Sequence, residues 1–225
     1  MVPQGGLDIR RTFDLLRMCS NLVQCEIHVT KNTDRGLTLD MPPIFLPHLD
    51  TLLFSNCDFR NWILVAPKLR FLRIGQAYSW HNESMPEAGF LSVDVDPNQL
   101  SSPDGLRDLL EYFPMISHLR LSSPSLDHLE LFCPPDDLLD LCPELTHLTV
   151  ISPHNGFSDA AALAFVKARM ALPLPLQQFC VRFGRQMKVD VMPELQCFIA
   201  DGLRVSLEYL APRWKFDAQE GLNGD

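Results

Sequence analysis

The 225-residue sequence predicts an α/β fold in which short strand-and-helix units stack side by side. Three observations support this prediction. A proline-led pattern, P-x-Φ-x-x-Φ-x-Φ with Φ an apolar residue, recurs along most of the chain, its copies lie mostly about 20 to 30 residues apart, and short helical patterns precede several of them. One such unit cannot bury its apolar side alone, but stacked units share a continuous core.

Each unit is expected to place a strand at the end of the pattern, after a turn that begins at the proline. Side chains two positions apart lie on the same face of a strand, so the last two apolar positions point into the core. The clear copies start at Pro47, Pro67, Pro114, Pro124 and Pro143, and the weaker ones at Ser20, Pro86, Leu174 and Pro193. The middle apolar residues expected to be almost fully buried, one in each turn of the chain, are Leu52, Leu72, Leu119, Leu148 and Phe198.

Proline also ends the helix of the preceding unit, because it has no backbone N–H and its ring clashes with the turn before it. The helical patterns carry apolar residues three or four positions apart, as in residues 108–113. The longest helix is expected from Ser158 to Met170, a segment rich in alanine.

One spacing does not fit the pattern. Only ten residues separate Pro114 from Pro124, whereas parallel strands need a longer crossover between them. The segment 126–131 is therefore predicted either to return antiparallel to 116–121 or to form a bare coil. A parallel strand of its own stays open as an alternative.

An L-x-x-L-x-L core at this spacing is typical of leucine-rich repeats. Residues 1–215 are thus predicted to form one irregular leucine-rich-repeat solenoid, with a parallel sheet on its concave side and short helices or coil on its convex side. Residues 216–225 contain little that could be buried and are expected to form a flexible C-terminal tail. Trp214 is expected to pack on the last strand as part of a cap.

Composition excludes several classes of function. Hydrophobic residues make up 46% of the chain, enough for a sizeable core, and the net charge of −9 argues against a nucleic-acid partner. The seven cysteines include no C-x-x-C pair and mostly lie in apolar stretches, as in a reducing compartment. With no signal peptide and no apolar run of membrane-spanning length, a soluble cytoplasmic or nuclear protein is expected, with no membrane partner.

The outward-facing strand positions supply the candidate binding residues. In a leucine-rich repeat, the positions on either side of the middle apolar residue face the concave, solvent side. Here they are polar and aromatic, as in surfaces that bind protein partners. The candidates for contact with a partner are Phe71, Arg73, Phe90, His118, Arg120 and His147.

Three histidines, His118, His128 and His147, each stand one position before a leucine of the pattern. Adjacent strands lie about 4.8 Å apart, so imidazoles on three in-register strands could converge on a zinc ion. Solvent-facing strand residues are the favoured interpretation, because His128 lies on the one segment that does not fit the repeat. His128 joins the row only if 126–131 forms a parallel strand.

Catalytic signatures are missing from the sequence. It contains no nucleophile-elbow, zinc-protease, phosphate-loop or dinucleotide motif, so neither an enzyme nor a cofactor is predicted. A metal-dependent enzyme that uses the histidine row is the less favoured alternative.

Four segments, LLRMCSNLVQCEI, LPHLDTLLF, APKLRFLRI and LLDLCPELTHLTV, resemble the leucine-rich-repeat region of F-box proteins from mushroom-forming fungi. The resemblance covers roughly residues 10–210 and depends most on the phrase L-L-x-x-C-P-x-L-x-x-L. In that family an N-terminal F-box recruits a Skp1-type adaptor of a cullin-RING ubiquitin ligase, and the repeats hold the substrate.

The resemblance implies protein–protein recognition, as the substrate-binding repeat region of an F-box-type ubiquitin-ligase receptor. No F-box is recognisable in this chain, so a Skp1-type adaptor is expected as a partner only if an F-box is supplied elsewhere. The alternative function is a leucine-rich-repeat regulator of an enzyme such as a GTPase, which would require an exposed arginine at an edge.

Overall fold

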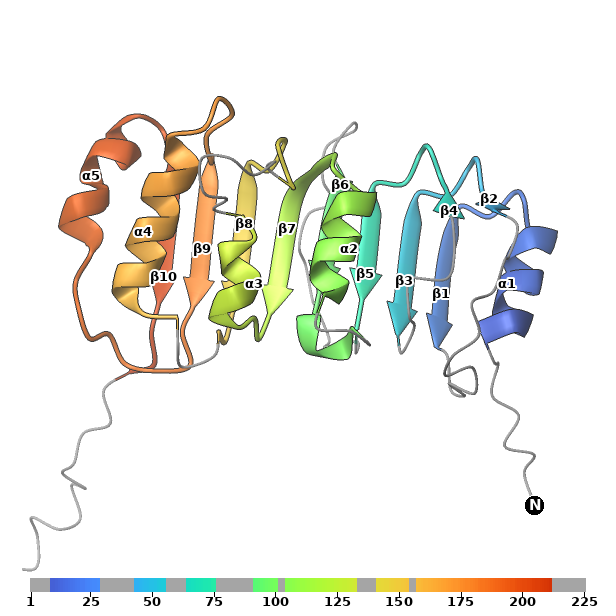
Figure 1. The fold of residues 1–225 in the computed structure, drawn as a ribbon, viewed down its shortest axis with the longest axis horizontal. Coiled ribbons are helices and arrows are strands. Elements are labelled where there is room, and N and C mark those ends of the chain that lie inside the picture. Colours follow the sequence, from blue (N-terminus) through green and yellow to red (C-terminus); the bar gives the residue numbers. More distant parts are fainter. Residues whose placement is uncertain are drawn as a thin grey trace, which may run out of the picture.

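The computed structural model describes residues 9–28, 43–55, 64–75, 91–100, 104–132, 141–153 and 157–211. Its main feature is an eight-stranded sheet whose strands are all parallel and follow one another in chain order (Figure 1). The strands are β1 (Gln24–His28), β3 (Thr51–Ser55), β5 (Phe71–Ile74), β6 (Leu91–Val95), β7 (Ile116–Ser122), β8 (His147–Ile151), β9 (Gln178–Arg182) and β10 (Arg204–Glu208). Two short strands, β2 (Ile44–Phe45) and β4 (Leu64–Val65), form a separate parallel pair.

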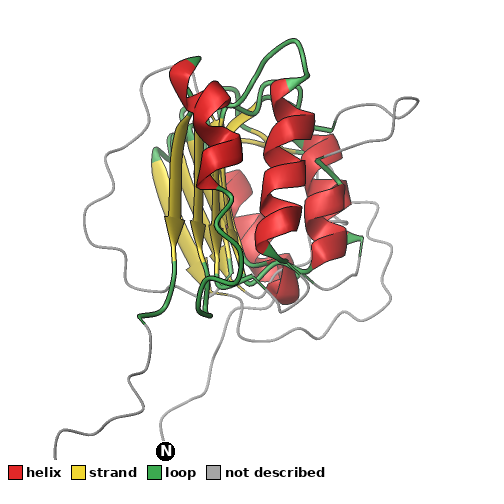
Figure 2. Cartoon of the chain, turned by 90° about the vertical axis from the view of Figure 1, so that its left-hand side faces the viewer, coloured by secondary structure: helices red, strands yellow, loops and turns green. Residues whose placement is uncertain are grey.

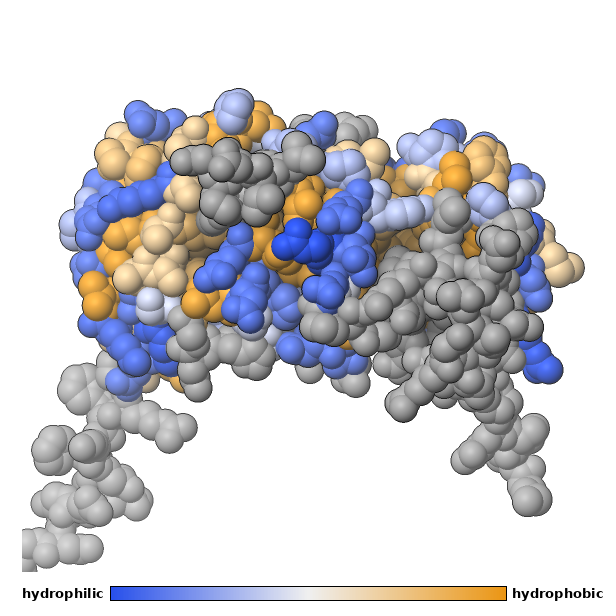
Figure 3. Space-filling model, in the orientation of Figure 1, coloured by the Kyte–Doolittle hydropathy of each residue, from blue (hydrophilic) through white to orange (hydrophobic). Residues whose placement is uncertain are grey.

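The α-helices of the described segments lie on the same side of the large sheet (Figure 2). They are α1 (Ile9–Met18), α2 (Gly105–Tyr112), α3 (Leu126–Glu130), α4 (Asp159–Met170) and α5 (Met192–Ala200), with a 3-10 helix η2 at Pro97–Gln99. Hydrophilic residues gather over α2 and α3 on this side (Figure 3). We call the opposite face, which none of the described helices covers, the open face. None of the described helices has the length and apolar character needed to cross a lipid bilayer.

The core lies between the sheet and the helices and is built from the inward-pointing residues of each strand. Four of the five middle apolar residues predicted to be buried, Leu52, Leu72, Leu119 and Leu148, are at most 2% exposed. The backbone register places them in one row across the sheet, which consists of Cys25, Leu52, Leu72, Val93, Leu119, Leu148, Phe179 and Val205. The burial predicted for these four residues is therefore confirmed.

The longest described helix, α4, has 12 residues and matches the sequence prediction for this segment. Its first turn is closed by Ser158, whose Oγ accepts a hydrogen bond of 3.1 Å from the Ala161 N–H. The acidic Asp159 in the first turn and the basic Lys167 and Arg169 in the last turn both complement the helix dipole.

Helix α3 replaces the structures predicted for residues 126–131, so the antiparallel strand, the bare coil and the parallel strand are all wrong for this segment. Ser125 and His128 form a reciprocal cap: Ser125 Oγ accepts from the His128 N–H at 3.3 Å, and His128 Nδ1 accepts from the Ser125 N–H at 3.1 Å. Leu126 and Leu129, which match the strand pattern, are also spaced as neighbours on one face of a helix.

Residues 193–200 were expected to enter a strand and instead belong to helix α5. Phe198 is therefore a partly buried helix residue, and the prediction that it is a fully buried strand residue is wrong. Pro193 lies in the first turn of α5, where a missing N–H leaves no hydrogen bond unmade. The last strand, β10, follows Gly202, which adopts a φ of 106° and ends the helix.

Some sequence predictions concern residues outside the described ranges. These are the domain boundary at residue 215, the tail 216–225, the packing of Trp214 and the position of Phe90.

Candidate functional site

The open face carries two rows of side chains that are set by the backbone register. The first row is Gln24, Thr51, Phe71, Ser92, His118, His147, Gln178 and Arg204. The second row lies two residues further along each strand and is Glu26, Leu53, Arg73, Asp94, Arg120, Thr149, Cys180 and Ser206. The two rows contain five of the six residues predicted to contact a partner: Phe71, Arg73, His118, Arg120 and His147.

Ser92 occupies the position in the first row that the sequence assigned to Phe90. The register pairs Leu72 with Val93 rather than with Leu91, which shifts this unit by two residues. Because Leu91 and Val93 are both apolar and both buried, the pattern fits either register. Phe90 itself lies outside the described residues.

The two histidines at the centre of the first row stack on each other. His118 on β7 and His147 on β8 are register partners, with ring centroids 4.0 Å apart and ring planes inclined by 16°. Both side chains are partly open to solvent. Their predicted equivalence on two strands of one parallel sheet is confirmed, whereas His128 lies outside the row because it caps α3.

A buried hydroxyl group contacts each of the two imidazoles. Ser117 Oγ lies 3.0 Å from His118 Nδ1, and Thr146 Oγ1 lies 2.9 Å from His147 Nδ1. The same hydroxyls donate to backbone carbonyl oxygens of the preceding strand, at 3.4 Å and 3.2 Å. Each hydroxyl group has a single hydrogen. When it donates that hydrogen to the carbonyl oxygen, its own oxygen can accept a hydrogen bond from the imidazole Nδ1–H. The repeated Ser/Thr-His-Leu triplet was the sequence signal for this arrangement.

Burial keeps the histidine pair uncharged at neutral pH. It lowers the pKa of His118, and it lowers the pKa of His147 to about 4, with further repulsion from His118 and Arg204. Neutral stacked rings present a polar but uncharged surface, whereas two imidazolium ions at this distance would repel each other. The centre of the first row is therefore a neutral aromatic pair.

The stacked geometry does not suit a metal centre. Nearly parallel rings direct their nitrogen lone pairs along nearly parallel lines, whereas the ligands of one zinc ion must converge on it at about 2.1 Å. Among the residues that the structure describes, no group of three or more His, Cys, Asp or Glu side chains is placed to hold a metal ion.

Charged side chains form the centre of the second row. Arg73 Nε donates to Asp94 Oδ2 at 3.1 Å, and the Arg73 guanidinium lies 5.3 Å from the centre of the Phe71 ring. Arg120 is the register partner of Asp94, and both are only 8% exposed. Phe71 and Arg73 thus keep some exposed surface for contact with a partner. Arg120 has much less exposed surface than its outward-facing strand position suggested.

Comparison with known proteins identifies no relative of this chain. No family model, no curated protein and no solved structure matches it.

Proposed function

We propose that this protein is an irregular leucine-rich-repeat solenoid whose open face binds a protein partner. Three features support the proposal: an all-parallel sheet with its strands in chain order, described helices on one side only, and the recurring proline-led apolar pattern. In such a stack, the face that none of the described helices covers offers a contact surface along the sheet.

The composition of the open face carries the proposal. Its first row combines a partly exposed phenylalanine, Phe71, with the neutral His118–His147 pair and the exposed Arg204. Aromatic and arginine side chains are enriched at the centres of protein interfaces. The hydroxyl contacts to the histidines also fix their ring orientations before a partner arrives, which reduces the entropy lost on binding.

The resemblance to the repeat region of fungal F-box proteins supports a more specific assignment. On this proposal the partner is a substrate protein of a cullin-RING ubiquitin ligase. A Skp1-type adaptor would be engaged only through an F-box supplied elsewhere.

A pull-down followed by mass spectrometry tests the proposed face. Three baits are compared: the wild type, the double variant His118→Ala/His147→Ala, and the matched control His48→Ala, which changes an exposed histidine in the turn before β3. We expect the same partner with wild type and control, and a loss of that partner with the double variant. A partner retained by all three baits would place the interface elsewhere. Zinc bound by the wild type and lost in the double variant would favour a metal site instead.

One observation favours the alternative of an enzyme regulator. Arg204 is exposed on β10, which lies at an edge of the sheet. An arginine that reaches into the active site of a GTPase needs such an exposed position at an edge. If the captured partner is a GTPase, its rate of GTP hydrolysis with and without this protein distinguishes the two functions. A stimulation that Arg204→Ala abolishes would support the regulator.

A further inference from the structure

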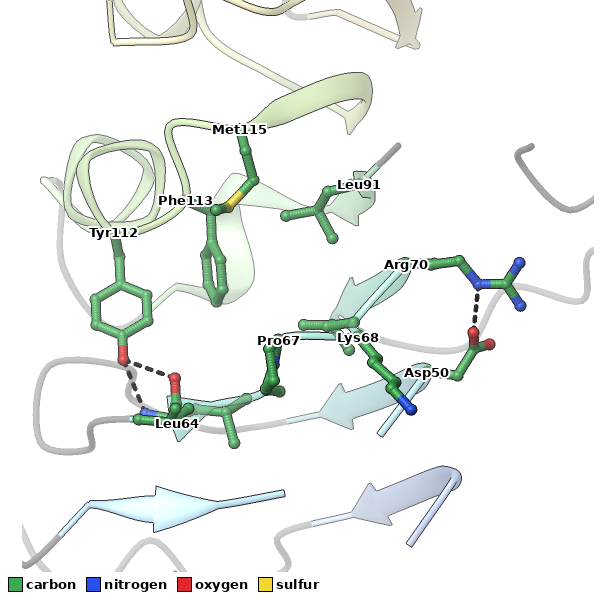
Figure 4. Close-up of a pocket in the computed structure, with 12 residues that line it drawn as sticks. Asp50, Leu64, Pro67, Lys68, Arg70, Leu91, Tyr112, Phe113 and Met115 are labelled. Atoms are coloured by element: carbon green, nitrogen blue, oxygen red, sulfur yellow. Dashed lines mark hydrogen bonds and ion pairs between the residues drawn. The ribbon is translucent and has the colours of Figure 1, made fainter. Parts of the chain in front are cut away.

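A second surface feature lies away from the two rows of the open face. A groove of about 780 Å³ separates the segment that leads into β5 from the C-terminal end of α2 (Figure 4). Leu64 and Pro67 line one wall, and Phe113 and Met115 line the other. The two walls come from parts of the chain more than 40 residues apart.

A tyrosine joins the two walls at the apolar end of the groove. Tyr112 Oη accepts from the Leu64 N–H at 2.8 Å and donates to the Leu64 carbonyl oxygen at 3.0 Å (Figure 4). The hydroxyl thus bonds both backbone groups of Leu64 on strand β4, which are then occupied and do not favour pairing with an added strand at this residue. A ligand of this groove would be held by side chains instead.

Exposed apolar side chains surround this end. Val65, Tyr112 and Met115 are 38%, 42% and 54% exposed, and all three line the groove. Phe45, the register partner of Val65 on β2, is 58% exposed and extends the same apolar surface. Tyrosine, phenylalanine and methionine are the side chains that protein interfaces use to take up apolar anchors.

The other end of the groove is cationic. Lys68 is exposed there, and Arg70 is held by its Nε hydrogen bond to Asp50, whose second oxygen accepts from Thr51 Oγ1 at 3.0 Å. Two cations and one carboxylate therefore line this end, in a chain whose net charge is −9. The local sign is opposite to that of the whole molecule, which favours an anionic group at this end over a cationic one.

We propose that the groove binds an acidic peptide segment of a protein partner, with an apolar side chain against Phe113 and Met115 and a carboxylate against Lys68. The apolar and cationic ends lie within one groove, so a short segment reaches both. None of the residues that line the groove belongs to the two rows of the open face, so this proposal does not require the proposed function of that face.

Three labelled peptides test the chemistry of the groove by fluorescence anisotropy: Ac-EELFE-NH2, its basic counterpart Ac-KKLFK-NH2, and Ac-EESSE-NH2, which lacks the apolar residues. We expect the first to bind most tightly. Lys68→Glu should weaken it by about tenfold or more and abolish the preference over the basic peptide. Met115→Asp should weaken it as well, since a carboxylate replaces part of the apolar wall.

Lys188→Glu is the matched control, because it reverses the charge of another exposed lysine on the loop before α5. It should leave the affinity unchanged. Equal binding of the acidic and basic peptides, or an affinity that Lys68→Glu does not change, would overturn the proposal. It would also be overturned if decanoate shifted the amide resonances of residues 64–70 and 112–115 while no peptide did, since the groove would then take an acyl chain.

Discussion

Single side chains form hydrogen bonds between distant parts of this chain, and Asp159 is the clearest example. Its side chain is 2% exposed and accepts hydrogen bonds from both terminal nitrogens of Arg185, from Tyr209 Oη and from the backbone N–H groups of Lys188 and Val189. One carboxylate at the start of α4 thereby fixes the loop after β9 and the end of β10. A buried charge is tolerated here because each oxygen has several donors.

Asp159→Asn should lower the free energy of unfolding at pH 7 by about 3–5 kcal/mol, because it leaves the largely buried Arg185 without its counter-charge. Urea unfolding of the variant and the wild type measures the difference. Glu144→Gln, which removes an exposed carboxylate from the turn before β8, is the control and should cost little.

The cost of Asp159→Asn should also depend on pH. Burial alone would raise the pKa of Asp159, but hydrogen bonds from Arg185, Tyr209 and two backbone amides outweigh it and hold the pKa below 3.8. The folded state therefore gains stability from this carboxylate above its ordinary pKa and loses it as the pH falls through the lower folded value. A difference between variant and wild type that stays constant from about pH 5 to about pH 2 would contradict this account.

Leu148 represents the buried row of the sheet. It is fully buried between its register partners Leu119 and Phe179. Leu148→Ala should cost about 2–5 kcal/mol of unfolding free energy, since it removes apolar contacts and leaves a cavity. Thr149→Ala, one position further and on the open face, should cost far less. A loss of stability for Leu148→Ala well under this range would argue that the row is loosely packed.

His147 should titrate at unusually low pH. Its folded pKa of about 4 lies below the 6.5 of a free histidine, so the unfolded chain binds a proton more readily over this interval. Wild-type stability should accordingly fall as the pH drops from 6.5 towards 4, and His147→Gln should reduce this fall. NMR titration of the imidazole Cε1–H gives the pKa directly, and a midpoint near 6.5 would show that the stacked ring is not desolvated.

At the scale of single elements, helix α3 shows how a cap can determine the secondary structure of a short segment. Five residues form too few internal hydrogen bonds to hold a helix without help. Ser125 and His128 supply that help by satisfying each other's backbone N–H groups, and Leu129 anchors the helix in the core.

Ser125→Ala should therefore cost about 1 kcal/mol of unfolding free energy, as the loss of a helix cap does. His128→Ala, which removes the acceptor for the Ser125 N–H, should lower the free energy of unfolding as well. In a double-mutant cycle, the double variant should lose less stability than the sum of the two single losses, because either change alone already breaks the reciprocal cap. Strict additivity would mean that the two bonds act separately.

The elements also show what the sequence could and could not predict. Strands β3, β5, β7, β8 and β9 follow from the apolar pattern, because each has two inward residues with a proline-containing turn before it. Residues 126–130 and 193–200 have the same apolar spacing but form helices, since residues three apart are also neighbours on one face of a helix. The equivalent positions of His118 and His147 follow from strand alternation, but the stacking of their rings does not. The Arg73–Asp94 ion pair required the register, which an apolar pattern leaves ambiguous by two residues.

At the scale of the whole molecule, the two edges of the eight-stranded sheet are unequal. The inward residues of both edge strands are only partly buried: Cys25 and Ile27 on β1, and Val205 and Leu207 on β10. The chain beyond β10 is fixed further, because Tyr209 bonds to Asp159 and stacks on Phe183 at 4.8 Å, and the Leu210 N–H donates to the Arg185 carbonyl oxygen. Because strands in such a stack contact only their neighbours, local stability should vary along the sheet.

Hydrogen exchange of the native protein should reveal this gradient. We expect the slowest amide exchange in the central strands β6 to β8, intermediate exchange in β10 and the fastest in β1, because β10 is fastened through Asp159. In Asp159→Asn the protection of β10 should fall towards that of β1, while β1 itself should not change, since it lies at the opposite edge. Equal loss of protection in all eight strands would mean that the sheet opens as one cooperative unit, and protection of β1 above that of β10 would contradict the role given to Asp159.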